Sequence, residues 1–88
     1  MEIVSLDNIN KKDIPLHYRN EYSGEVVYKN MLGQEESIPV EFIVERSALG
    51  TLDISVEFTS SLDYPLLPAL RSVKTFIARM DKEGRLPW

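Results

Sequence analysis

The stretch that decides the fold is PVEFIVERSALGTLDISVEF, residues 39–58, in which apolar and acidic side chains alternate on both sides of one glycine. Strict alternation of this kind is typical of half-buried β-strands. It predicts one strand over about residues 37–47 and a second over about residues 51–59. The even-numbered side chains should point into the core: Ile38, Val40, Phe42 and Val44 from the first strand, and Leu52, Ile54, Val56 and Phe58 from the second.

The loop between these two strands sets their pairing register. A two-residue turn would place apolar Phe42 opposite acidic Glu57, which would mix the two faces of the sheet. A three-residue loop at residues 48–50 shifts the pairing by one and places Phe42 opposite Val56. It also puts Gly50 where a three-residue hairpin needs a left-handed backbone. We therefore predict the three-residue loop.

The chain before this hairpin predicts a third strand. Residues 22–31 alternate between apolar and polar positions, and residues 32–34 supply a turn glycine. Residues 2–6 are a candidate fourth strand at the sheet edge. The polar segment after them is typical of a loop, with at most one helical turn after Asp7.

A helical pattern follows the hairpin, over about residues 66–83. Gly84 is a plausible stop for this helix, and Ser61 and Asp63 are candidate caps at its start. Apolar residues recur along it at spacings of four and three: Leu66, Leu70, Val73, Ile77 and Met80. The fold class we predict is α+β, a two-layer sandwich in which an antiparallel β-meander of three to four strands is covered on one face by the C-terminal helix.

The composition limits the class of protein. The chain has 88 residues, 43% of them hydrophobic and 27% charged, which fits a single small domain over residues 1–88. Residues 1–20 are open to being a partly ordered N-terminal arm. The absence of cysteine excludes disulfides and thiolate chemistry. We expect a cytoplasmic protein with no membrane contact, because we find neither a signal-peptide pattern nor an apolar run of ~20 residues.

The net charge of −4 conceals an uneven distribution. Residues 1–63 carry 12 acidic and 5 basic side chains, whereas residues 64–88 carry 2 acidic and 5 basic ones. Such a division indicates either a surface for a charged partner or a distribution that only serves solubility.

The predicted register gathers carboxylates on the sheet face that points away from the helix. Direct opposition of like charges is mildly destabilising. Water and salt can screen these charges, or a basic protein partner can bind them. A divalent cation is a third reading, which a flat sheet suits poorly, so we predict no metal site. The candidate partner-binding residues, including two apolar neighbours, are Glu41, Glu45, Asp53, Glu57, Val27 and Ile43.

Basic side chains gather on the helix face opposite its apolar stripe, within about 140° of arc. They are Arg71, Lys74, Arg79, Lys82 and Arg85. They can bind an acidic protein, phosphate or nucleic acid, or they can simply complement the helix dipole. We disfavour nucleic acid, because the acidic remainder of the protein repels phosphates and the predicted sheet aromatics point inward, away from any base.

The sole histidine, His17, suggests an alternative. A pocket around His17, Tyr18 and Arg19 and the loop before the helix would make the chain a small ligand-binding or enzyme-subunit domain. A catalytic histidine needs an orienting carboxylate and a reacting group within reach, and the sequence places neither. The terminal Trp88 either anchors in a partner or folds back over the helix end.

The sequence favours a non-enzymatic protein-interaction or accessory domain without a cofactor. A protein partner or self-association is expected. A two-fold dimer that joined sheet to sheet would bring like charges together, so a head-to-tail contact or a basic partner on the sheet fits the charges better.

Overall fold

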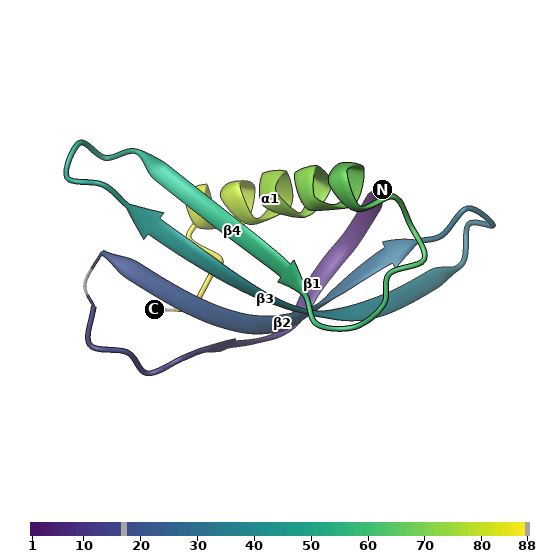
Figure 1. Cartoon of the computed structure of the whole chain (residues 1–88), viewed down its shortest axis with the longest axis horizontal. Helices are drawn as coiled ribbons and strands as arrows, with labels where there is room; N and C mark the ends of the chain where they lie inside the picture. Colours follow the sequence, from purple (N-terminus) through teal and green to yellow (C-terminus); the bar gives the residue numbers. More distant parts are fainter. Residues whose placement is uncertain (17, 88) are drawn as a thin grey trace.

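The computed structural model describes residues 1–16 and 18–87 of the chain. Four strands form one antiparallel sheet in chain order, and a helix covers one of its faces (Figure 1). The predicted two-layer α+β sandwich is confirmed. The elements are β1 (Glu2–Lys11), β2 (Arg19–Lys29), β3 (Glu35–Arg46), β4 (Leu52–Phe58) and α1 (Leu66–Lys82).

The hairpin formed by β3 and β4 has the predicted register, with Phe42 paired to Val56. The Ser47 amide donates a hydrogen bond to the Thr51 carbonyl at 2.9 Å, which closes a three-residue loop. Gly50 in that loop has a φ of 83°. Glycine suits this position because any other residue would be strained in the left-handed region.

Strand β2 begins at Arg19, three residues earlier than predicted. Its first residues are polar and break the apolar alternation, which is why the sequence did not reveal them. The early start places Arg19 opposite Glu45 on β3. The turn that follows β2 is held by the side-chain oxygen of Asn30, which accepts hydrogen bonds from the amides of Leu32 at 2.9 Å and Gln34 at 3.0 Å.

Strand β1 extends to Lys11, well beyond the predicted residues 2–6, and it pairs with β2. The expected loop with a helical turn after Asp7 is therefore wrong. Two register shifts interrupt the pairing, and Asn8, within the second of them, has a φ of 52°. Each shift changes which side chains face the core, so a bulged strand loses the alternation by which strands are predicted.

Helix α1 ends within one residue of the prediction, and Gly84 follows it with a φ of 69°. Its start differs from the prediction. Pro65 is the capping residue and no side chain makes a capping hydrogen bond, so Ser61 and Asp63 do not cap the helix. Pro68 lies in the first turn, where amides have no partner within the helix and proline is tolerated.

The core lies between α1 and the inner face of the sheet. Phe42 is 1% exposed and stacks on Tyr22, with ring centroids 4.8 Å apart. From the helix, Val73 and Ile77 fill the space opposite them. The buried apolar residues are Leu6, Tyr22, Val26, Tyr28, Ile38, Val40, Phe42, Val44, Ala69, Val73, Ile77, Met80 and Leu86.

Two contacts fasten the end of α1 and the residues after it to the sheet. The Arg46 guanidinium at the end of β3 pairs with the Asp81 carboxylate. The Tyr22 hydroxyl donates a hydrogen bond to the Pro87 carbonyl at 3.0 Å. With these contacts in place, α1 lies on the inner face and the outer face of the sheet stays uncovered within the described chain (Figure 1).

Candidate functional site

The outer face of the sheet carries the acidic side chains that the sequence predicted for it. Glu41 on β3 pairs across the ladder with Glu57 on β4, and Glu45 pairs with Asp53. These positions alternate with the buried core positions of the same strands, so their side chains point away from α1. The carboxylates are therefore gathered along β3 and β4 on one exposed surface, which we call the acidic face.

Two basic residues that the sequence analysis did not assign to this face lie on it. Lys12, just after β1, places its Nζ 3.4 Å from Oε1 of Glu41. Arg19 on β2 has its Nε 3.1 Å from Oε2 of Glu21 and a guanidinium nitrogen 4.0 Å from Oε2 of Glu45. Both β3 carboxylates are thus partly neutralised, by pairs exposed enough for water and salt to weaken them.

The sequence carried only part of the signal for these ion pairs. The pairing of Arg19 with Glu45 follows from the β2–β3 ladder, once β2 is known to start at residue 19. The position of Lys12 follows from neither composition nor alternation, because it depends on the two shifts in β1. The acidic face was predicted, but its partial neutralisation was not.

The β4 carboxylates are not neutralised in the same way. Among residues 1–16 and 18–87, the salt bridges include none to Asp53 or Glu57. Both side chains are exposed, and they lie on the strand at the sheet edge. The negative potential of the acidic face is therefore concentrated along β4.

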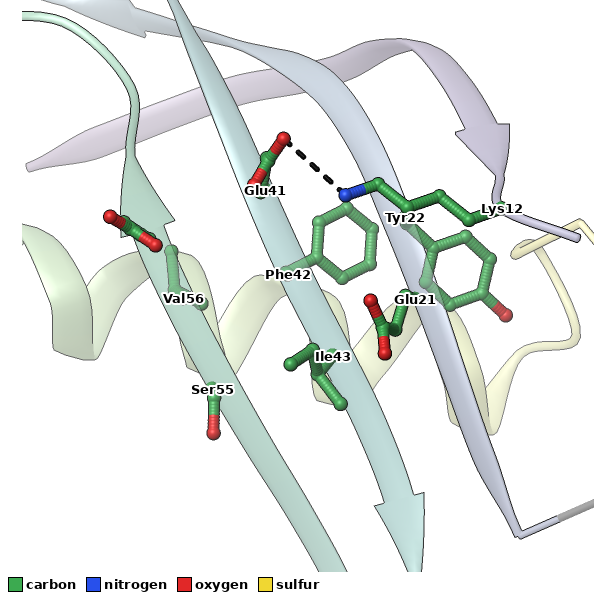
Figure 2. Close-up of a pocket in the computed structure, with 9 residues that line it drawn as sticks. Lys12, Glu21, Tyr22, Glu41, Phe42, Ile43, Ser55 and Val56 are labelled. Carbon is green, nitrogen blue, oxygen red and sulfur yellow. Dashed lines mark ion pairs between the residues drawn. The ribbon is translucent and has the colours of Figure 1, made fainter. Parts of the chain in front are cut away.

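A shallow hollow of about 360 Å³ lies in the middle of the acidic face. Figure 2 shows the side chain of Lys12 reaching toward Glu41 at one side, with Ile43 and Ser55 lying along β3 and β4. Ile43 is half-buried and pairs with Ser55, whose small side chain leaves space beside it. The outward-facing residues that line the hollow are Lys12, Glu21, Glu41, Ile43, Ser55 and Glu57.

The predicted site residues do not all meet at this hollow. Val27 lies further along β2, between Ser5 and Ser37, where β4 no longer accompanies the sheet. It faces the same side as Ile43 but lies outside the hollow. The apolar part of the candidate site is therefore Ile43 alone.

The basic side chains predicted for the helix lie on the opposite side of the molecule and are all exposed. Arg71 and Arg79 flank a second hollow, of about 400 Å³, between α1 and the start of β1, where Phe76 and Ile3 meet. Arg85 lies just past the helix and pairs with Glu83, with an N–O distance of 3.2 Å. The described fold thus separates an acidic sheet face from a basic helix face.

A model of one protein family matches residues 1–82 of the 88-residue chain. The chain belongs to the BB_0187 family. No curated protein and no solved structure matches it. Membership in the family by itself assigns no activity, so the function of this domain must be inferred from its surface.

The region around Tyr18 does not form the pocket that the alternative hypothesis requires. His17 and Trp88 lie outside the described residues. Tyr18 lines a hollow of about 90 Å³ near the end of α1, together with Arg46 and Asp81. The loop before α1 instead borders β4 at the other end of the sheet, near Phe58. The structure therefore does not bring Tyr18 and that loop together.

The chemistry of the described residues is that of a binding surface. Within residues 1–16 and 18–87, no group of three or more histidine, aspartate or glutamate side chains is placed to hold a metal ion. Two tyrosines have raised pKa values. Burial is the main cause of the raised pKa of Tyr22 and of Tyr28, and for Tyr28 the hydrogen bond to Glu36 adds to it. Both phenols point into the fold, and neither faces the hollow on the acidic face.

The one helix of the described chain, with 17 residues, is not long and apolar enough to cross a membrane.

Proposed function

We propose that this domain is a non-enzymatic, cytoplasmic protein-interaction domain that binds a basic segment of a partner protein on its acidic face. The observation that carries the proposal is the pair of exposed carboxylates on β4, Asp53 and Glu57, beside half-buried Ile43 and an open hollow. A basic segment would supply the missing counter-charges there, and an apolar side chain could cover Ile43. Interfaces commonly combine such an apolar centre with a charged rim.

The charge distribution also favours a partner of one sign on this face. The carboxylates on β3 already have Lys12 and Arg19 near them, so an incoming cation gains most beside β4. Partly screened surface charges steer encounter and select partners more than they add affinity. Binding should therefore weaken as the salt concentration rises.

Selection from a displayed library of random peptides tests the proposal. We expect the selected peptides to be enriched in lysine and arginine. The double variant Asp53→Asn, Glu57→Gln should lose this enrichment, because it removes the β4 charges while leaving the side chains nearly the same size.

The matched control is Glu25→Gln, which removes a charge from the same face at the end that β4 does not reach. It should select the same peptides as the unchanged domain. Selection of acidic or uncharged peptides, or equal enrichment by the double variant, would contradict the proposal.

A further inference from the structure

The two edges of the sheet differ in how well they are protected against pairing with another strand. Strand β1 is interrupted by two register shifts and contains Asn8 in the left-handed region, features that spoil an edge for strand addition. Strand β4 pairs with β3 over seven residues without a shift. Its outer edge has no partner strand within residues 1–16 and 18–87. A regular, unpaired edge is therefore present on β4 only.

The hydrogen bonds at the two ends of the β3–β4 ladder show which backbone groups of β4 face this edge. The Ser47 amide bonds to the Thr51 carbonyl at 2.9 Å, and the Thr59 amide bonds to the Pro39 carbonyl at 3.1 Å. In an antiparallel pair, residues bonded to the neighbouring strand alternate with residues whose amides and carbonyls point away from it. The odd-numbered residues of β4 therefore face β3, and the outward ones are Leu52, Ile54, Val56 and Phe58.

The same four residues direct their side chains toward the core, but β4 covers them incompletely. They are half-buried, whereas their partners on β3, such as Val40 and Phe42, are 1% exposed. A groove of about 390 Å³ continues from Val56 and Phe58 to the start of α1. Two leucines at that helix start, Leu66 and Leu67, are 56% and 69% exposed. An added strand would find free backbone groups and an apolar groove on the same edge.

We infer that β4 accepts one extended segment of a partner protein as a fifth, antiparallel strand, in which apolar residues alternate with basic ones. The apolar side chains would enter the groove beside Leu66, and the basic ones would lie on the acidic face opposite Asp53 and Glu57. This inference rests on the proposed function and gives the partner segment its conformation and sequence pattern. Strand addition of this kind takes its affinity from the backbone and its specificity from alternate side chains.

Charge argues against a second copy of the chain as the occupant. In the two-fold pairing with full overlap, centred on Ser55, Asp53 of each copy would lie opposite Glu57 of the other. The joined sheets would also bring the two acidic faces edge to edge. Like charges directly opposed across strands are destabilising, whereas lysine or arginine in those positions is stabilising.

Peptides with matched modifications test the inference without changing the protein. The probe is a seven-residue peptide that alternates valine with lysine, equal in length to β4. It is added at millimolar concentration and low salt to the isotope-labelled chain. We expect amide chemical-shift changes at Leu52, Ile54, Val56 and Phe58. A peptide that alternates valine with glutamate should leave these signals unchanged.

N-methylation of the peptide identifies the backbone pairing. In an antiparallel fifth strand, the valines lie opposite the outward residues of β4 and exchange both hydrogen bonds with them. Methylating the two inner valine amides should therefore abolish the shift changes at Val56. Methylating two lysine amides, which point to solvent, should preserve them. Loss with both peptides, loss with only the methylated lysines, or loss with neither would overturn antiparallel strand addition at β4.

A protein variant gives a second test. Val56→Pro removes an amide that faces the open edge and should lower the affinity for the valine–lysine peptide at least tenfold. The control is Val4→Pro in β1, next to a register shift on the opposite edge, which should bind as the unchanged chain does. Equal binding by both folded variants would overturn the inference, and the methylated peptides decide it if Val56→Pro does not fold.

The inference and the proposed function fail in different ways. Shift changes confined to Ile43 and Glu41, with the β4 edge unchanged, would leave a partner site on the acidic face and overturn strand addition. The absence of any change on either surface, together with no enrichment of basic peptides, would overturn both. A chain that dimerises with concentration and broadens the signals of Val56 would show that a second copy is the occupant, against the inference.

Discussion

Tyr22 is 2% exposed, yet its hydroxyl keeps a hydrogen bond to the Pro87 carbonyl at 3.0 Å. Tyr28, 4% exposed, donates to Oε2 of Glu36 at 3.1 Å in the same way. No buried side-chain nitrogen or oxygen in the described part of the chain lacks a partner. Each ring thus fills the core while its polar end is satisfied, and burial raises the pKa of both phenols above the usual 10.0.

These raised pKa values predict a loss of stability in alkaline solution. The unfolded chain releases the phenolic protons near pH 10, while the folded chain holds them to higher pH. The unfolded state then binds fewer protons, so the free energy of unfolding, unaffected below pH 10, falls as pH rises through the folded pKa. Denaturant unfolding followed at increasing pH should show this fall.

The variant Tyr22→Phe isolates the contribution of one phenol. It should lose about 1 kcal/mol at neutral pH, because the hydrogen bond to Pro87 is gone. Its stability should then fall less steeply above pH 10 than that of the unchanged chain, since lysines titrate alike in both. Identical slopes in the two proteins would show that Tyr22 ionises as freely in the fold as outside it.

The elements differ in how far alternation controls them. β3 and β4 alternate without interruption and pair in one register throughout. The same regularity places Glu41 opposite Glu57, a repulsion that the hairpin retains on its exposed side. β1 is also a full strand, but its two shifts remove the sequence signal. Regular strands were predicted to within a few residues, and the bulged one was not.

The repulsion within the hairpin predicts a stabilising substitution. Glu57→Lys would replace two opposed carboxylates by an ion pair and should raise the free energy of unfolding by about 0.2–1 kcal/mol. The gain should shrink at high salt, because both groups are exposed. Urea unfolding at low and high ionic strength measures it.

A double-mutant cycle assigns that gain to the cross-strand pair. In the background of Glu41→Gln the substitution Glu57→Lys should stabilise the chain less than in the unchanged background. An equal gain in both backgrounds would trace the effect to the overall negative charge of the protein and not to the opposition of Glu41 and Glu57.

At the scale of the whole molecule, the residues after α1 complete the core. Leu86 is 5% exposed and joins the cluster formed by the sheet and the helix. The pairing of Arg46 with Asp81 and the bond from Tyr22 to Pro87 hold this segment against β2 and β3. The polypeptide therefore closes its own core near one end of the sheet, while the groove along β4 at the other stays open.

Two equal truncations predict the difference between these regions. Leu86→Ala should lower the free energy of unfolding by about 2–4 kcal/mol, because it leaves a cavity in the core. Leu67→Ala, at a side chain 69% exposed, should change it by less than about 0.5 kcal/mol. Thermal or urea unfolding compares the two. Similar losses would mean that Leu86 is not held in the core or that Leu67 is covered.

The candidate site was predicted only in part. Alternation and the parity of the hairpin loop place four carboxylates of β3 and β4 on one face, and the structure has them there. They do not show that Lys12 and Arg19 lie beside two of them, or that Val27 lies elsewhere. The position of Lys12 depends on shifts in β1, which leave no periodic pattern to read.

The sequence by itself determined the secondary structure of its regular segments, the β3–β4 register and the separation of acidic and basic faces. These follow from local rules, because a period of two or of 3.6 residues fixes which side chains share a surface. Only the tertiary structure decided the length of β1, the burial of Leu86 and the uncovered edge of β4. Each of these depends on which segments distant in the chain pack together, and packing is not written in the spacing of any single segment.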